Sequence, residues 1–130
     1  MASHCIGLDL GSTANNHSGD FGEACRRETE AALDGQGIVW SGPPGSIGTT
    51  TVKGKKLALI AFHTSGATND VNDLATAKKL VAQAAASHDL VIVSFHGGAE
   101  GLGADRVKDG AEKYLGEKKL AKRDNADCSS

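Results

Sequence analysis

Two amides and an imidazole, Asn15, Asn16 and His17, follow the apolar stretch "CIGLDLGST" near the start of the chain. A neutral imidazole can ligate a metal ion or give a proton to a leaving oxygen, and a side-chain amide offers a cation a neutral carbonyl oxygen. These residue types therefore indicate a metal site or acid–base chemistry. The alternative is local, because asparagines at such a position also cap or turn the chain.

A second polar cluster follows the apolar run "DLVIVSF", where His96 precedes two glycines and then Glu100. Ligands of open α/β sheets bind outside the carboxyl ends of the strands, so an imidazole there is well placed to meet a metal or a substrate. The glycines let another backbone or a phosphate approach closely. His63 ends another apolar run, and we expect it at the same edge. For both histidines the alternative is a hydrogen-bonded polar residue without a ligand.

The first cluster must be held between a strand and a helix. The segment "DFGEACRRETEAALDGQG" predicts a helix from Asp20 to Gly35, with Asp20 as its side-chain cap and Glu23 three residues on. A short strand is predicted at 38–40, ending before "GPPG", because prolines cannot continue a hydrogen-bonded ladder. Two β-prone runs on either side of 53–55 then predict a hairpin.

The second cluster requires a strand with a covering helix. Apolar residues recur at helical spacing over 70–87, behind Asn69 and Asp70, which can cap the first turn. This helix separates predicted strands at 56–62 and 89–95, and the second of these is an apolar run typical of a strand covered on both faces. Strand, helix and strand together predict a βαβ unit and an α/β fold.

Composition narrows the class of protein. A chain of 130 residues fits one domain, and a formal net charge of -2 provides no cationic field for nucleic acid or an anionic bilayer. The apolar stretches are too short for a membrane helix, and the first residues lack the pattern of a signal peptide, so we expect a cytoplasmic protein. The cysteines are odd in number and form no CxxC pair, which favours reduced thiols.

The segment "IGLDLGST" also resembles the first phosphate-binding motif of actin-like sugar kinases and chaperone ATPases. That fold requires a second strand directly after the turn and a second lobe with further acidic and glycine motifs. Here a charged helix is predicted after the turn, and the chain has no room for a second lobe. An actin-like nucleotide binder is therefore the weakest of the functions considered.

Four segments in this order resemble the bacterial capsule and poly-γ-glutamate synthesis protein family: "LGSTANNHSGDFGEACRRETEAALDGQGI", "SGPPG", "HDLVIVSFHGGAEG" and "YLGE". The resemblance covers roughly residues 8–117, and the family is similar to calcineurin-like metallophosphatases. It implies part of a layered α-β sandwich, a small-molecule or polymer substrate, and a divalent metal such as manganese, zinc or iron. Members of this family include membrane-anchored and exported proteins.

The resemblance also implies residue roles. Asn16 matches a metal-ligand asparagine, and His17 matches the adjacent histidine that acts on the phosphoryl or leaving group. His96 matches the metal-binding histidine at the end of the next core strand. The resemblance implies that Asp20 and Glu100 support the ligands or contact substrate. His63 is a further candidate for such a role because of its place at the end of a predicted strand. A divalent metal held in such a site polarises a phosphoryl oxygen and activates water near neutral pH.

The sequence departs from the family pattern at both ends. Family members begin with a "GD" strand whose aspartate ligates metal and close with a "GH-x-H" segment that supplies further histidines, and neither is found here. We therefore expect a partial domain at 1–117, the middle of such a fold, and a polar, disordered tail at 118–130. The expected function is a metallophosphoesterase-like synthesis protein with a truncated metal site and weak or no activity. A non-catalytic accessory or interaction module on the same scaffold is the alternative.

Overall fold

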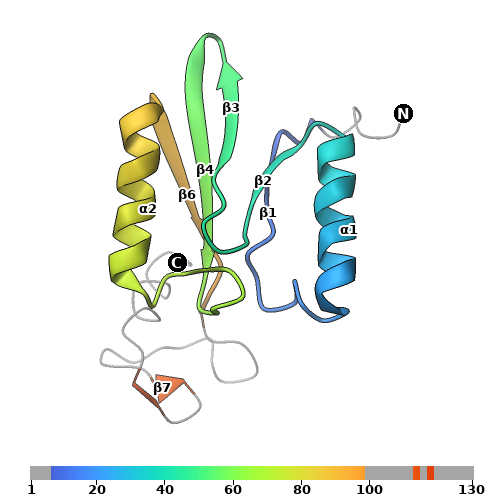
Figure 1. Ribbon diagram of the computed structural model, residues 1–130, viewed down its shortest axis with the longest axis vertical. Coiled ribbons are helices and arrows are strands. Elements are labelled where there is room, and N and C mark those ends of the chain that lie inside the picture. Colours follow the sequence, from blue (N-terminus) through green and yellow to red (C-terminus); the bar gives the residue numbers. More distant parts are fainter. Residues whose placement is uncertain (1–6, 99–112, 115–116, 119–130) are drawn as a thin grey trace. The chain divides into compact units, whose positions relative to one another are not determined.

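The computed structural model describes residues 7–98, 113–114 and 117–118 (Figure 1). The chain divides into two units, Met1–His96 and Gly97–Ser130. The first contains β1 (Leu10–Ser12), α1 (Gly22–Gly35), β2 (Val39–Ser41), β3 (Gly48–Val52), β4 (Lys55–His63), β5 (Asn69–Asp70), α2 (Leu74–Ser87) and β6 (Leu90–Phe95). In the second, β7 (Lys113–Tyr114) pairs with β8 (Glu117–Lys118) in antiparallel orientation. This mixture of helices and strands confirms the predicted α/β class.

The predicted βαβ unit is present as β4, α2 and β6. The two strands are parallel, and their register runs from Leu57 opposite Leu90 to Phe62 opposite Phe95. Side chains two residues apart on β4 share one face and meet side chains one helical turn apart on α2. The buried cluster formed in this way comprises Ala58, Ile60, Phe62, Leu80 and Ala84. Burial of these side chains fixes the position at which β6 delivers His96.

β6 differs from its prediction as a strand covered on both faces. Val91 and Phe95 pack against the buried cluster, whereas Leu90 and Val93 are 53% and 54% exposed. Among the described residues β6 pairs with β4 alone. A continuous apolar run identifies the strand but does not reveal how many neighbours cover it.

The predicted hairpin is confirmed between β3 and β4. These strands are antiparallel, with Gly48 opposite Leu59 at one end and Val52 opposite Lys55 at the other. The two residues of the turn, Lys53 and Gly54, have φ values of 49° and 77°. A two-residue turn of type I′ requires positive φ at both positions, which explains the glycine.

Helix α1 ends at Gly35 as predicted, but its predicted cap is wrong. The residue at the N-cap is Phe21, and no side chain there accepts a hydrogen bond from the first turn. The Asp20 carboxylate instead lies 2.9 Å from Nδ1 of His17. The carboxylate is thus turned back toward the loop that carries His17, away from the helix amides.

Helix α2 begins later than predicted. Its N-cap is Asp73, whose carboxylate accepts a hydrogen bond from the Thr76 amide at 3.1 Å. Asn69 and Asp70, the predicted caps, form β5 and pair in parallel with the end of β4. The sequence offers several capping residues before this helix, and pairing with β4 removes the first two from that role.

Asn69 anchors the loop after β2 to the sheet. Its side chain is buried, with 3% of the residue exposed. Oδ1 accepts from the Gly45 amide at 2.7 Å, and Nδ2 donates to the carbonyls of Ser46 and Ala61, each at 3.1 Å. The buried Ser41 hydroxyl accepts from the Ala61 amide at 3.0 Å and contacts Ser46. A buried polar network of this kind is stabilising only when all its members are paired.

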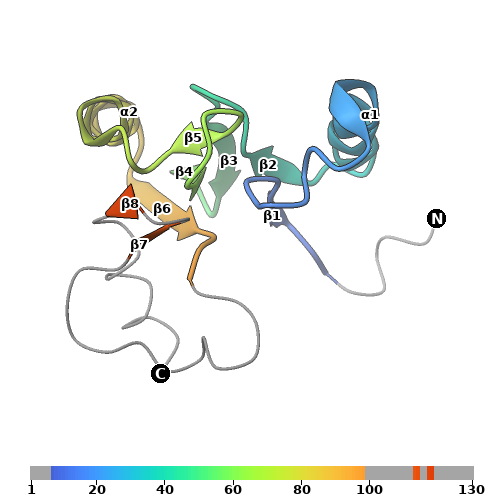
Figure 2. The same ribbon diagram turned by 90° about the horizontal axis from the view of Figure 1, so that it is seen from below.

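β1 and β2 are parallel, with Leu10 opposite Val39 and Ser12 opposite Ser41. The loop after β1 leads into α1, so the antiparallel hairpin that an actin-like site needs is not formed by these residues. Both α1 and α2 lie on the same side of the strands (Figure 2). Of the helices in the described ranges, none is long and apolar enough to cross a membrane. Apart from Lys118, the predicted tail lies outside the described residues, and the predicted boundary at 117 stays a prediction.

Candidate functional site

The loop after β1 meets the end of β6 at the carboxyl edge of the strands. Nε2 of His96 lies 2.8 Å from Oδ1 of Asn16, although the two residues are 80 positions apart in the chain. Both side chains remain accessible, Asn16 exposed and His96 partly buried. The two segments singled out from the sequence therefore come together.

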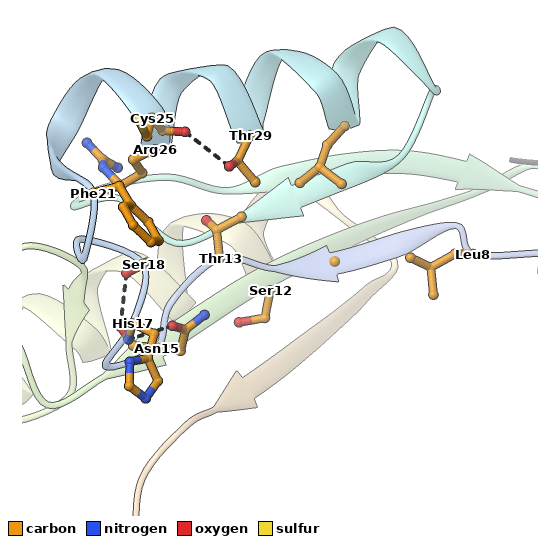
Figure 3. A pocket seen from close by; sticks show the side chains of 12 residues that line it. Leu8, Ser12, Thr13, Asn15, His17, Ser18, Phe21, Cys25, Arg26 and Thr29 are labelled. Carbon is orange, nitrogen blue, oxygen red and sulfur yellow. Dashed lines mark hydrogen bonds between the residues drawn. The ribbon is translucent and has the colours of Figure 1, made fainter. Parts of the chain in front are cut away.

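Asn15 shapes the loop that presents these residues. Its Oδ1 accepts from the His17 amide at 2.8 Å, and its backbone carbonyl accepts from the Ser18 hydroxyl at 2.9 Å. Figure 3 shows Asn15 and Ser18 joined beside the imidazole of His17. The local alternative, an asparagine that turns the chain, describes Asn15, whereas Asn16 points its amide toward His96.

Four side chains form one continuous series of hydrogen bonds. Asp20 Oδ2 lies 2.9 Å from Nδ1 of His17, and Nε2 of His17 lies 3.2 Å from Nδ2 of Asn16. Because the carboxylate only accepts and the amide nitrogen only donates, His17 carries its proton on Nδ1. Asn16 then offers Oδ1 as an acceptor, so His96 must donate from Nε2. One set of tautomers satisfies every member of the series.

His63 holds the other side of His96. Its Nδ1 lies 2.8 Å from the backbone carbonyl of His96, and the two imidazole rings meet edge to face at 5.4 Å between centroids. The His96 amide donates to the Phe62 carbonyl at 3.0 Å, which extends the pairing of β6 with β4. His63 thus lies at the same edge as His96, as expected.

The loop after β1 packs against the end of β2. The Thr13 amide donates to the Ser41 carbonyl at 2.9 Å. A Cβ atom placed on Gly42 would lie 2.0 Å from Oγ1 of Thr13 and 2.9 Å from the Ala14 amide nitrogen. Only glycine therefore fits at this point. The sequence does not predict this contact, because nothing in "SGPPG" reveals which glycine faces another segment.

Two atoms of the cluster are suited to a cation, the Asn16 Oδ1 oxygen and the His96 Nε2 nitrogen, which can ligate once its proton has moved to Nδ1. Their separation of 2.8 Å is close to the roughly 3 Å between neighbouring ligands of an octahedral ion with bonds of about 2.0–2.1 Å. Within the part of the chain that the structure describes, no group of three or more His, Cys, Asp or Glu side chains could hold a metal ion. Glu100 lies outside the described residues. The cluster fits a divalent ion in donor type and spacing but supplies few ligands.

A pocket of about 480 Å³ lies between β1 and α1, with His17 at one end (Figure 3). Phe21, Thr29 and Leu33 contribute to its helical wall. Arg26 also lines it, but its guanidinium is paired with Glu23 and with Glu30. The hydrogen bond to Glu23 raises the pKa of Arg26, and the same bond lowers the pKa of Glu23. The arginine that lines the pocket is therefore already neutralised, which favours an uncharged occupant.

Comparison with protein families gives a match over most of the chain. The family model described as bacterial capsule synthesis protein PGA_cap matches residues 2–107, which include both segments of the cluster. No curated protein and no solved structure matches this chain.

Proposed function

The chain belongs to the family described as bacterial capsule synthesis protein PGA_cap, and from this premise we propose that its cluster is a truncated metallophosphoesterase-like site. The site binds a divalent ion weakly, and any phosphoester hydrolysis by this chain is slow. The observation that carries the proposal is the 2.8 Å contact between Asn16 Oδ1 and His96 Nε2. It joins an amide oxygen and an imidazole nitrogen, two donor types of first-row divalent metals, at one exposed edge.

Asn16 and His96 are the residues that would hold the ion. Affinity depends on the number of ligands as well as on their type, so two protein ligands bind weakly. A divalent ion bound there would supply Lewis acidity toward a phosphoryl oxygen. In the metal-free chain Nε2–H of His96 donates a hydrogen bond to Oδ1 of Asn16. This hydrogen bond keeps both side chains directed at the same point.

His17 is the proposed proton donor to the leaving oxygen. Asp20 holds the ring through Nδ1 and thereby directs Nε2 toward the cluster. Nε2 carries no proton in the arrangement described above, so it would first take one up from solvent and then pass it to an alkoxide that departs on that side. Because His17 also lines the pocket beside α1, the organic part of the leaving group would lie in that pocket. We therefore favour phosphoesters with an uncharged, partly apolar alcohol.

The test is hydrolysis of bis(p-nitrophenyl) phosphate with added manganese. We expect slow turnover that depends on the metal and is lost in His96→Ala and in Asn16→Ala. His88→Ala is the matched control, because His88 contacts Thr49 and the end of α2, away from the cluster. Turnover that survives loss of both Asn16 and His96, or that needs no metal, would contradict the proposal.

One observation favours a non-catalytic accessory or interaction module as the second candidate. The described residues hold no group of three or more His, Cys, Asp or Glu side chains suited to a metal ion. A chain of this kind folds stably, takes up no manganese and hydrolyses no phosphoester. Metal binding measured without any substrate therefore separates the two functions.

A further inference from the structure

We propose that His63 is a positioning residue that fixes the imidazole of His96 in its contact with Asn16. This inference rests on the proposed function, because the direction of the His96 ring matters to a site only if that ring is a ligand. His63 is not a member of the hydrogen-bonded series that runs from Asp20 to His96. Its side chain acts instead through the backbone and the ring face of His96.

The end of β6 needs such a support. The last strand residue is Phe95, and the His96 amide is the final donor paired with β4, through the Phe62 carbonyl. Two glycines follow, and Gly98 has a φ of 116°, which side-chain-bearing residues rarely adopt. The backbone beyond His96 therefore places little restraint on the direction of its imidazole.

His63 restrains His96 at two points. Its Nδ1–H donates to the His96 carbonyl at 2.8 Å, which pairs the first carbonyl beyond the strand. Its ring meets the His96 ring edge to face, with centroids 5.4 Å apart and an angle of 62° between the planes. One contact fixes the peptide plane after His96, and the other limits rotation of the imidazole.

His63 is itself held in place by the fold. It is the last residue of β4, opposite Asp70 in β5. The Val71 amide donates to its carbonyl at 3.0 Å, so its backbone is paired beyond the short β5 strand. The short strand that replaces the predicted start of α2 therefore fixes the backbone of the positioning residue.

The test compares two substitutions of the full chain. His63→Asn keeps a donor where Nδ1 stands, whereas His63→Phe keeps a ring but removes the donor. Two-bond ¹H–¹⁵N spectra of the histidine rings, recorded without metal at about pH 8 where free imidazole is neutral, report the tautomer of each ring. The His96→Ala variant identifies the His96 signals, and far-UV circular dichroism verifies folding.

We expect His96 to carry its proton on Nε2 in the wild type and in His63→Asn, and to show a mixture of tautomers in His63→Phe. Manganese affinity should fall roughly tenfold in His63→Phe and stay close to wild type in His63→Asn. Unchanged His96 signals in His63→Phe, or equal loss in both variants, would overturn the inference. If His63→Phe does not fold, His63→Gln replaces it. A wild type that binds no manganese refutes the proposed function, while the spectra still decide the role of His63.

Discussion

Replacement of Asn69 by alanine should destabilise the fold by about 3 kcal/mol. The substitution leaves the Gly45 amide and the Ala61 carbonyl without their side-chain partner, whereas the Ser46 carbonyl keeps its hydrogen bond from the Ser41 hydroxyl. A buried polar group left unpaired costs about 1–3 kcal/mol, so two such groups set an upper bound near 6 kcal/mol. The cavity is polar, and one water molecule bonded to both would recover part of that loss. The remaining cost is a large part of a typical stability of about 5–15 kcal/mol.

Urea unfolding followed by circular dichroism measures this change in the free energy of unfolding. The matched control is Asn72→Ala, because the Asn72 amide is exposed and, among the described residues, donates to Asp70. An exposed substitution of this kind should stay within about 0.5 kcal/mol of wild type. A loss below about 1 kcal/mol in Asn69→Ala, with an unchanged denaturant slope, would refute the reasoning that the loop after β2 depends on this side chain.

Three further substitutions test other parts of the fold and the cluster. Gly42→Ala should cost about 2 kcal/mol in urea unfolding, because its Cβ would collide with Thr13, while Gly66→Ala, where nothing lies within 4 Å, should cost little. Asp20→Ala should shift the His17 proton from Nδ1 toward Nε2 in ring ¹⁵N spectra, and an unchanged tautomer would show that the carboxylate does not orient the ring. The Thr76 side chain and then its amide lower the pKa of Asp73. Its charge therefore stabilises the fold above the unfolded pKa of about 3.9, and this contribution is lost as pH falls through the lower folded value. Asp73→Asn should keep the cap and show a weaker decline of the melting temperature below about pH 4, and equal declines would contradict the assignment.

Local sequence patterns predicted those helices, strands and turns whose conformation depends on residues of a single segment. The hairpin at Lys53 and Gly54 and the end of α1 at Gly35 depend on backbone conformations that few residues adopt, so their residue types reveal them. The apolar periodicity of α2 and the run in β6 likewise predicted the βαβ unit. The starts of both helices were misjudged, because Asp20 and Asn69 find partners elsewhere in the fold. Capping residues compete with tertiary partners that a local pattern cannot show.

The candidate site likewise contains residues that the local sequence predicts and contacts that it does not. Asn16, His17 and His96 were selected from residue type and from their places at the ends of apolar runs, and the structure brings them together. Their roles as ligands and as proton donor stay predictions. The contacts of Gly42 with Thr13 and of His63 with the His96 carbonyl depend on pairings between distant strands, and no sequence signal reports them. Expectations about nucleic acid and cellular location also remain predictions.

The most direct test of whether Asn16 and His96 together hold one divalent ion is a double-mutant cycle in which manganese binding is measured. Titration of the full chain, followed by the electron paramagnetic resonance signal of free Mn²⁺, gives the affinity without any substrate. We predict weak binding by the wild type, loss in Asn16→Ala and in His96→Ala, and no additional loss in the double variant, because both side chains serve one ion. Binding that is equal in the wild type and in the double variant, or no binding by the wild type, would contradict a metal site at this edge.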